Sequence, residues 1–264
     1  TAIGVNALYN NRAGIAGVAI GMYSQYNVNS SSSTWDNTNT SIGYESLRGS
    51  GTPANNTGTS NIAIGRAALY SNSSGSGNIA TGQGALYGNT SASQNTAIGY
   101  SALAAQSYNP GASWISNNVA VGYLALNQNQ PTTVNNGISN TAVGSEAMYS
   151  NTQGYSNTAL GYRALYTNST GYFNTATGQG ALYQNTTGYL NTATGHDALV
   201  FNMTGGNNTA TGESALRNNT AASFNTADGM NALRNNTLSG YNTAIGANAL
   251  STQSYDPGYV WYSE

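Results

Sequence analysis

Small, polar and apolar residues recur along this chain in a pattern with a period of 17 residues. Residues 174–190 read NTATGQGALYQNTTGYL, and Asn191 starts the same pattern again. A fixed short period is typical of a solenoid or repeat array. We therefore interpret residues 1–264 as one continuous array rather than as separate globular domains. The glycine of the N-T-A-x-G motif marks each of fourteen repeats, at Gly4, Gly21, Gly43, Gly65, Gly82, Gly99, Gly122, Gly144, Gly161, Gly178, Gly195, Gly212, Gly229 and Gly246.

Alternation within each repeat predicts short strands. The position two residues before the marker glycine is alanine in every repeat except one, which has Ser41. In a strand, such an alanine points to one face and its two neighbours point to the other. Glycine, threonine and asparagine are poor helix formers, and the Asn-Thr-Thr-Gly segments favour turns. We expect each repeat to form one coil of two short strands and two turns.

Stacked coils of this kind predict an all-β fold, a parallel β-solenoid with the shape of a rod. Neighbouring parallel strands lie about 4.8 Å apart, so fourteen coils span roughly 65 Å. Alanine before the marker glycine and alanine or leucine after it predict a narrow interior. Asparagines in register, such as Asn174 and Asn191, are expected to bond coil to coil as a ladder.

The residue directly before the marker glycine should point outward if the alanine points inward. This row is aliphatic in most repeats and turns polar from Thr177 to Asp228. A monomer rarely leaves so long an aliphatic stripe bare, which predicts that copies of the chain pack against each other along it. The candidate seam consists of Ile3, Ile20, Ile42, Ile64, Ile98, Val121, Val143, Leu160 and Ile245.

Several repeats resemble the head repeats of YadA-like trimeric autotransporter adhesins, and similar repeats of bacterial and phage tail-fibre proteins. The matching segments are residues 17–21 (GVAIG), 61–65 (NIAIG), 95–99 (NTAIG) and 118–122 (NVAVG). The resemblance extends over all fourteen repeats. It implies a left-handed parallel β-roll, assembly as a homotrimer, and a role in attachment to surfaces, outside the cell or on a virion fibre.

Charge and candidate chemistry argue against catalysis and against several classes of partner. Only 5% of the residues are charged and the net charge is −2, which does not favour a nucleic-acid or membrane-surface partner. There is no cysteine, and no apolar run is long enough to cross a membrane. His196 stands beside Asp197, but no motif supports a triad, and we expect a solvated surface pair. The acidic residues stand singly, so we predict no enzyme, no metal site and no cofactor.

Threonine pairs in three consecutive repeats support an alternative function. The pairs would form a two-column lattice of hydroxyl groups, which is the arrangement found in ice-binding solenoids. The other interpretation is a polar section of the trimer interior. The residues of the candidate ice-binding face are Thr175, Thr177, Thr192, Thr194, Thr209 and Thr211.

Insertions between repeats are the most favourable places for specific recognition. We place them near residues 28–38, 49–59, 105–116, 128–138 and 252–264. Loops on a rigid scaffold commonly bind ligands, and exposed aromatic rings suit sugars or a protein receptor. Alternatively, each loop folds over a neighbouring coil and its tryptophan seals a gap. The candidate recognition residues are Trp35, Tyr108, Trp114, Tyr255 and Trp261.

Tyrosines in register are expected to stack along the rod and stabilise it. They form two columns, Tyr149, Tyr166 and Tyr183, and Tyr155, Tyr172 and Tyr189. The sequence begins and ends inside the repeat pattern, so we expect coils to continue in a longer fibre or by head-to-tail stacking into a filament. The leading hypothesis is a non-catalytic extracellular structural or adhesive fibre segment.

Overall fold

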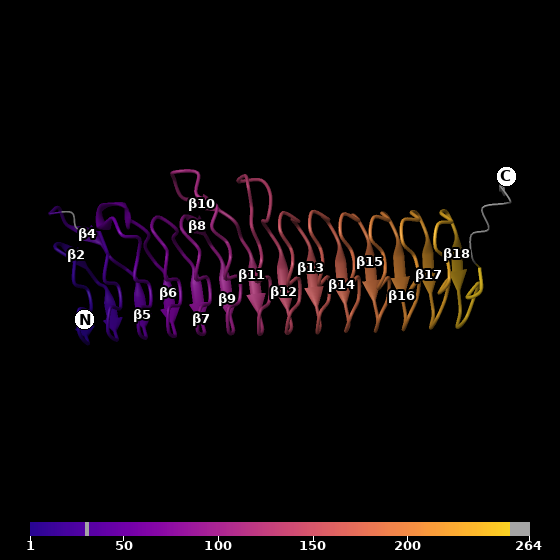
Figure 1. Cartoon of the computed structure of the whole chain (residues 1–264), viewed down its shortest axis with the longest axis horizontal. Coiled ribbons are helices and arrows are strands. Elements are labelled where there is room, and N and C mark those ends of the chain that lie inside the picture. Colours follow the sequence, from indigo (N-terminus) through magenta and orange to yellow (C-terminus); the bar gives the residue numbers. More distant parts are fainter. Residues whose placement is uncertain (30–31, 254–264) are drawn as a thin grey trace.

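The chain forms a rod of stacked coils in a computed structural model, which describes residues 1–29 and 32–253 (Figure 1). Each coil contributes one strand to a single parallel sheet of fourteen strands, which we call the long sheet. The all-β parallel solenoid predicted from the repeat is thereby confirmed. The strands of the long sheet are β1 (Ala2–Ile3), β3 (Val18–Ile20), β5 (Thr40–Ile42), β6 (Ile62–Ile64), β7 (Ile79–Thr81), β9 (Thr96–Ile98), β11 (Val119–Val121), β12 (Thr141–Val143), β13 (Thr158–Leu160), β14 (Thr175–Thr177), β15 (Thr192–Thr194), β16 (Thr209–Thr211), β17 (Thr226–Asp228) and β18 (Thr243–Ile245).

The strands pair in the register that the repeat predicts, with each interior alanine opposite the next. Ala176 of β14 pairs with Ala193 of β15. The longer repeats keep this register, since Ala97 of β9 pairs with Ala120 of β11 across an insertion. The extra residues therefore leave the coil as loops and do not disturb the ladder.

The prediction of two strands in every coil is wrong. Among residues 1–29 and 32–253, a second pairing occurs only between β2 (Gly14–Ile15) and β4 (Trp35–Asp36), and between β8 (Ala92–Ser93) and β10 (Trp114–Ile115). In the remaining described coils the chain after the marker glycine consists of turns, apart from the short 3-10 helix η1 (Pro53–Asn55). Gly180 and Leu182 lie in one of these turns, with φ angles of +67° and +53°, whereas a strand needs negative values.

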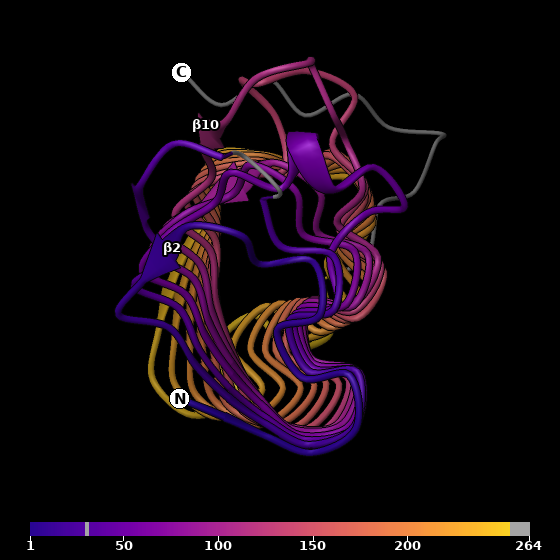
Figure 2. The same cartoon turned by 90° about the vertical axis from the view of Figure 1, so that its left-hand side faces the viewer.

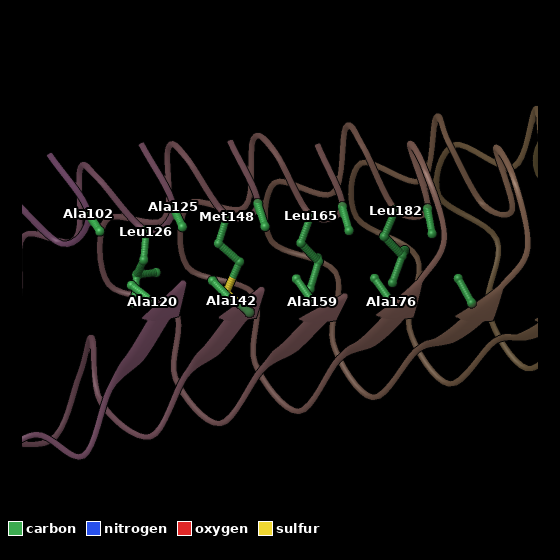
Figure 3. Close-up of a cluster of buried hydrophobic side chains, with 14 of the residues drawn as sticks. Ala102, Ala120, Ala125, Leu126, Ala142, Met148, Ala159, Leu165, Ala176 and Leu182 are labelled. Atoms are coloured by element: carbon green, nitrogen blue, oxygen red, sulfur yellow. The ribbon is translucent and has the colours of Figure 1, made fainter. Parts of the chain in front are cut away.

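The core is a narrow column of alanine and leucine side chains (Figure 3). Within one coil, Ala176, Ala181 and Leu182 are fully buried. Met148 replaces leucine in one coil and is equally buried. Because the alanines are small, the strand and the opposite turn lie close together, and one leucine for each coil fills the remaining space.

Two asparagine ladders satisfy the polar groups of this interior. The asparagines of the first ladder stand directly before the strands of the long sheet in the sequence. In this ladder, Asn191 donates from its backbone N–H and from Nδ2 to Oδ1 of Asn174, both over 3.1 Å. A second ladder lies on the opposite turn, where Nδ2 of Asn185 donates to Oδ1 of Asn168 over 2.8 Å. The carbonyl oxygen of Gly188 accepts from both Asn174 and Asn185. The ladder predicted from the sequence is present, and in this coil the carbonyl of Gly188 joins the second ladder to it.

The insertions in the first half of the chain protrude from one side of the rod (Figure 2). The loops around η1, β10 and residues 128–138 all leave the coils there. The proposed insertion at 252–264 lies outside the described residues from 254 onward. The long sheet itself continues without interruption past the loops.

Candidate interaction surfaces

The outer face of the long sheet is formed by the side chains directly before and after each interior alanine. Strand β13 shows the alternation, with Thr158 and Leu160 exposed on either side of buried Ala159. Register pairing aligns the candidate seam residues into one row, for example Ile42 with Ile64 and Val121 with Val143. The candidate seam residues are all at least partly exposed: Ile20, Val121 and Val143 are half-buried, and Ile3, Ile42, Ile64, Ile98, Leu160 and Ile245 are exposed.

The outer face is two residues wide, which the sequence reasoning did not include in the seam. The second column holds Val18, Ile62, Ile79 and Val119, and threonine in the other three-residue strands. Nearly every residue of both columns is β-branched, so its side chain is stiff and loses little freedom on packing. The sequence contains the pattern that predicts this second column, because its residues stand next to the interior alanine in the same way as those of the first column.

The threonine pairs continue this outer face toward the end of the rod. Thr175, Thr192 and Thr209 align in one column, and Thr177, Thr194 and Thr211 in the other. All six side chains are exposed or half-buried. Asp228 follows Thr211 in the register and is the one charged residue of the outer face among the described strands.

His196 and Asp197 are both at least partly exposed on their coil. The carboxylate of Asp197 pairs with the guanidinium of Arg217, at 3.8 Å from Nε, and the side chain of His196 is exposed. Within residues 1–29 and 32–253, no cluster of three histidine, aspartate or glutamate side chains could hold a metal ion. No helix in the described part of the chain is long and apolar enough to span a membrane.

The aromatic residues of the insertion loops lie against the coils. Trp114 is only 7% exposed, and its strand β10 pairs with β8 through Ala92. Tyr108 packs edge-on against Trp114 with ring centroids 5.8 Å apart. This is the alternative left open by the sequence, in which a loop folds over a neighbouring coil. Trp35 is half-buried in β4, while Tyr255 and Trp261 lie outside the described residues.

The tyrosine columns predicted from the sequence are confirmed. Tyr166 stacks between Tyr149 and Tyr183, with centroids 5.3 and 5.0 Å apart. The second column, Tyr155, Tyr172 and Tyr189, stacks at 5.1 and 5.3 Å. Burial within its stack raises the pKa of the Tyr166 phenol above its ordinary value, and the nearby carboxylate of Glu146 acts in the same direction.

No protein-family model, no curated protein and no solved structure matches this chain. Functional interpretation therefore depends on the surfaces described above.

Proposed function

We propose that this chain is a non-catalytic structural and adhesive segment of a trimeric fibre, located outside the cell or on a virion. The observation that supports this proposal best is the outer face of the long sheet, an uncharged surface of stiff side chains interrupted only by Asp228 within the described strands. A surface that is flat, regular and partly aliphatic is suited to packing against identical surfaces of sister chains. The number of three chains comes from the resemblance of the repeats to trimeric adhesin heads.

Energetics favour such packing. Ile64 and Ile98 are 38% and 41% exposed in the single chain, so a seam would remove a substantial apolar area from water at each coil. Burial of that area contributes about 1–2 kcal/mol for each isoleucine. For the nine seam residues of one chain the sum is about 9–18 kcal/mol, which is comparable with the loss of translational and rotational freedom on association, on the order of 4–15 kcal/mol.

Adhesion would involve the sides of the fibre that the seam leaves free. The loops around η1, β10 and residues 128–138 protrude from the coils and are accessible in this arrangement. A surface glycan or a protein receptor is the expected class of partner for these loops.

The mass of the chain in solution tests this proposal. We expect light scattering with size-exclusion chromatography to give three times 27.1 kDa for the unmodified chain. Ile64→Asp with Ile98→Asp should reduce the mass to one chain, since each introduces a charge into the seam. Leu238→Asp is the matched control, because Leu238 is an exposed aliphatic residue outside the long sheet. A stable single chain of 27.1 kDa for the unmodified protein would contradict the proposal.

Ice binding is a second candidate, supported by the six aligned threonines of β14, β15 and β16. Two columns of hydroxyl groups on strands about 4.8 Å apart form a regular lattice on a rigid surface. This function requires the outer face to be free in solution, so it predicts a single chain in the mass measurement. Thermal hysteresis tests it directly: absence of activity at millimolar concentration would remove this candidate, and Thr194→Tyr should abolish any activity that is found.

A further inference from the structure

The residue five positions after each marker glycine forms a column on the turn beside the long sheet, which we call the ring column. Tyr70 and Tyr87 stack in it with ring centroids 4.9 Å apart and ring planes 9° from parallel. The next residue of the column is Ala104, since the N–H of Gly88 donates to its carbonyl oxygen across adjacent coils. The aromatic stack therefore stops at Tyr87, and one face of this ring has no aromatic neighbour in the column.

Exposure agrees with an uncovered ring. Tyr87 is 45% exposed, whereas Tyr166, which has a tyrosine on each side, is half-buried. The stack of Tyr149, Tyr166 and Tyr183 ends differently. There Val200 follows Tyr183 in the ring column and is itself buried. The open face of Tyr87 is thus a local feature of this coil and not a general property of the column.

Small residues around Tyr87 make a hollow of about 340 Å³. Its floor comes from the position two residues after the marker glycine, which is Ala67, Gly84 and Ser101 in three consecutive coils. The next coil has Leu124 at this position. Tyr87, Ala104, Arg66 and Gln83 complete the lining.

The polar groups of the hollow are available to a ligand. The side-chain amide of Gln83 and the hydroxyl of Ser101 form no hydrogen bond with the described protein atoms. Arg66 also lines the hollow, and its guanidinium lies over the ring of Tyr44, 5.9 Å from the ring centroid. No carboxylate lines the hollow. The site therefore combines one aromatic surface with an amide, a hydroxyl and a cation.

We propose that this hollow binds a hexopyranose ring of a glycan, stacked on Tyr87 at the place where the aromatic column stops. A pyranose has an apolar face of C–H groups and a rim of hydroxyls. The apolar face covers the aromatic ring, and the hydroxyls reach Gln83, Ser101 and Arg66. A purely aromatic ligand would stack equally well but would leave Gln83 and Ser101 without partners.

A second hollow in the same chain provides an internal comparison. The segment GQGALY occurs at residues 82–87 and again at 178–183. The second copy forms a smaller hollow of about 180 Å³, because Asp197 fills part of it. A Cβ atom on Gly180 would lie 2.5 Å from Oδ1 of Asp197. Since this hollow is small and contains a carboxylate, we expect no sugar binding there.

Saturation-transfer NMR on the whole chain tests the site, with methyl β-glucopyranoside, methyl β-galactopyranoside and methyl β-glucuronide as probes. We expect binding of at least one probe with a dissociation constant in roughly the millimolar range. The signals should arise mainly from one C–H face of the ring. A probe set of two neutral sugars and one acidic sugar also shows whether the charge of Arg66 selects the ligand.

Three substitutions and one control locate the binding. Ala104→Tyr continues the stack into the hollow, as Tyr149 and Tyr166 do elsewhere, and should weaken binding by a factor of roughly ten or more without lowering the Tm. Ser101→Leu introduces the residue that the next coil has at the equivalent position, Leu124. This substitution and Tyr87→Ala should weaken binding to the same extent. Val200→Tyr extends the other stack and should leave binding unchanged.

Two results would overturn the assignment. The first is absence of binding for all three sugars, or equal binding by the unmodified chain and Ala104→Tyr. The second is binding of p-cresol without any sugar, which would make the hollow an aromatic site. The hollow is lined by residues of the turn and not by residues of the long sheet, so both results are distinct from a failure of the proposed seam.

Discussion

A Cβ atom on Gly178 would lie 2.6 Å from the carbonyl oxygen of Gly195, the equivalent residue of the next coil. Gly178 also has a φ angle of +126°, which side-chain-bearing residues rarely adopt. The marker glycine therefore meets two requirements, the bend at the end of the strand and the close stacking of coils. Both explain why the repeat keeps glycine at this position.

Replacement of this glycine should destabilise the rod. We expect Gly178→Ala to lower the free energy of unfolding by at least about 2 kcal/mol, because the methyl group meets backbone atoms that cannot move aside without separating two coils. Urea unfolding followed by circular dichroism measures the change. Gly51→Ala is the control, since nothing lies within 4 Å of a Cβ atom there. Equal stability of the two variants would show that the coils can separate at little cost.

The asparagine ladder should be sensitive to removal of a single amide. In Asn191→Ala, the backbone N–H and Nδ2 of Asn208 lose the oxygen that accepts both of their hydrogen bonds. Nδ2 of Asn208 keeps its hydrogen bond to the carbonyl oxygen of Ala222, so the backbone N–H is the donor left wholly without a partner, at a cost of about 1–3 kcal/mol. Amide hydrogen exchange should therefore accelerate in the coils next to the substitution. Asn135→Ala, at an exposed loop position, should leave exchange in those coils unchanged.

The interior leucines should tolerate methionine better than isoleucine. Leu182 is fully buried and has a φ angle of +53°, a conformation that is especially unfavourable for a β-branched residue. Leu182→Met should cost less than about 1.5 kcal/mol, in agreement with Met148 at the equivalent position of another coil. Leu182→Ile should cost more, although its volume is the same as that of leucine. The order of the two thermal midpoints checks this prediction, and the reverse order would contradict it.

Alkaline pH should weaken the stack around Tyr166. The pKa of Tyr166 is raised in the folded chain, so its contribution to stability is complete below the ordinary tyrosine value of about 10. That contribution is lost as the pH rises through the raised pKa. Tyr166→Phe keeps an aromatic ring between Tyr149 and Tyr183 but cannot ionise, so the midpoint of alkaline unfolding should move to higher pH. Tyr241→Phe should not move it, since Tyr241 is 80% exposed.

Removal of the charge on the outer face should stabilise the sheet and strengthen association. Asp228 pairs in register with Thr211 and Ile245, and aspartate is unfavourable in strands. We expect Asp228→Ile to raise the free energy of unfolding by about 0.5–1 kcal/mol and to lower the concentration at which the chain associates. Glu213→Gln removes a charge from an exposed position off the outer face and is the control. If the two variants had equal dissociation constants for self-association, the chains would not pack along this row.

The fold could be predicted from the sequence because the period identifies equivalent residues directly. Ala176 is interior and Thr175 is exposed, as alternation required. The turns that follow the marker glycine could not be predicted in this way, because Leu182 adopts a positive φ that its own side chain disfavours. Packing of the narrow interior determines that conformation, and a local pattern does not contain it. The second asparagine column, which includes Asn185, also repeats every 17 residues. Its position in the sequence did not indicate that these side chains lie in the interior of the coil.

The candidate surfaces were predictable to different degrees. Leu160 and the other seam residues lie in one row because their position in the repeat determines the face of the sheet. The placement of Trp114 depends on how its loop folds back onto β8, and the repeat carries no information about that loop. The place of Ala104 in the column can be read from the repeat, but the hollow that it leaves beside Tyr87 also depends on the stacking of Tyr70 on Tyr87.

The nearest-neighbour bonding of the coils also determines how the rod responds to tension. Each strand of the long sheet pairs only with the strands of the adjacent coils, and both asparagine ladders follow the same rule. A force that pulls the two ends apart therefore acts on these bonds in series, and the weakest contact between two coils breaks first. Each released coil of 17 residues would lengthen the chain by roughly 55 Å. Detachment of a few coils would then dissipate mechanical work while the rest of the rod remains folded.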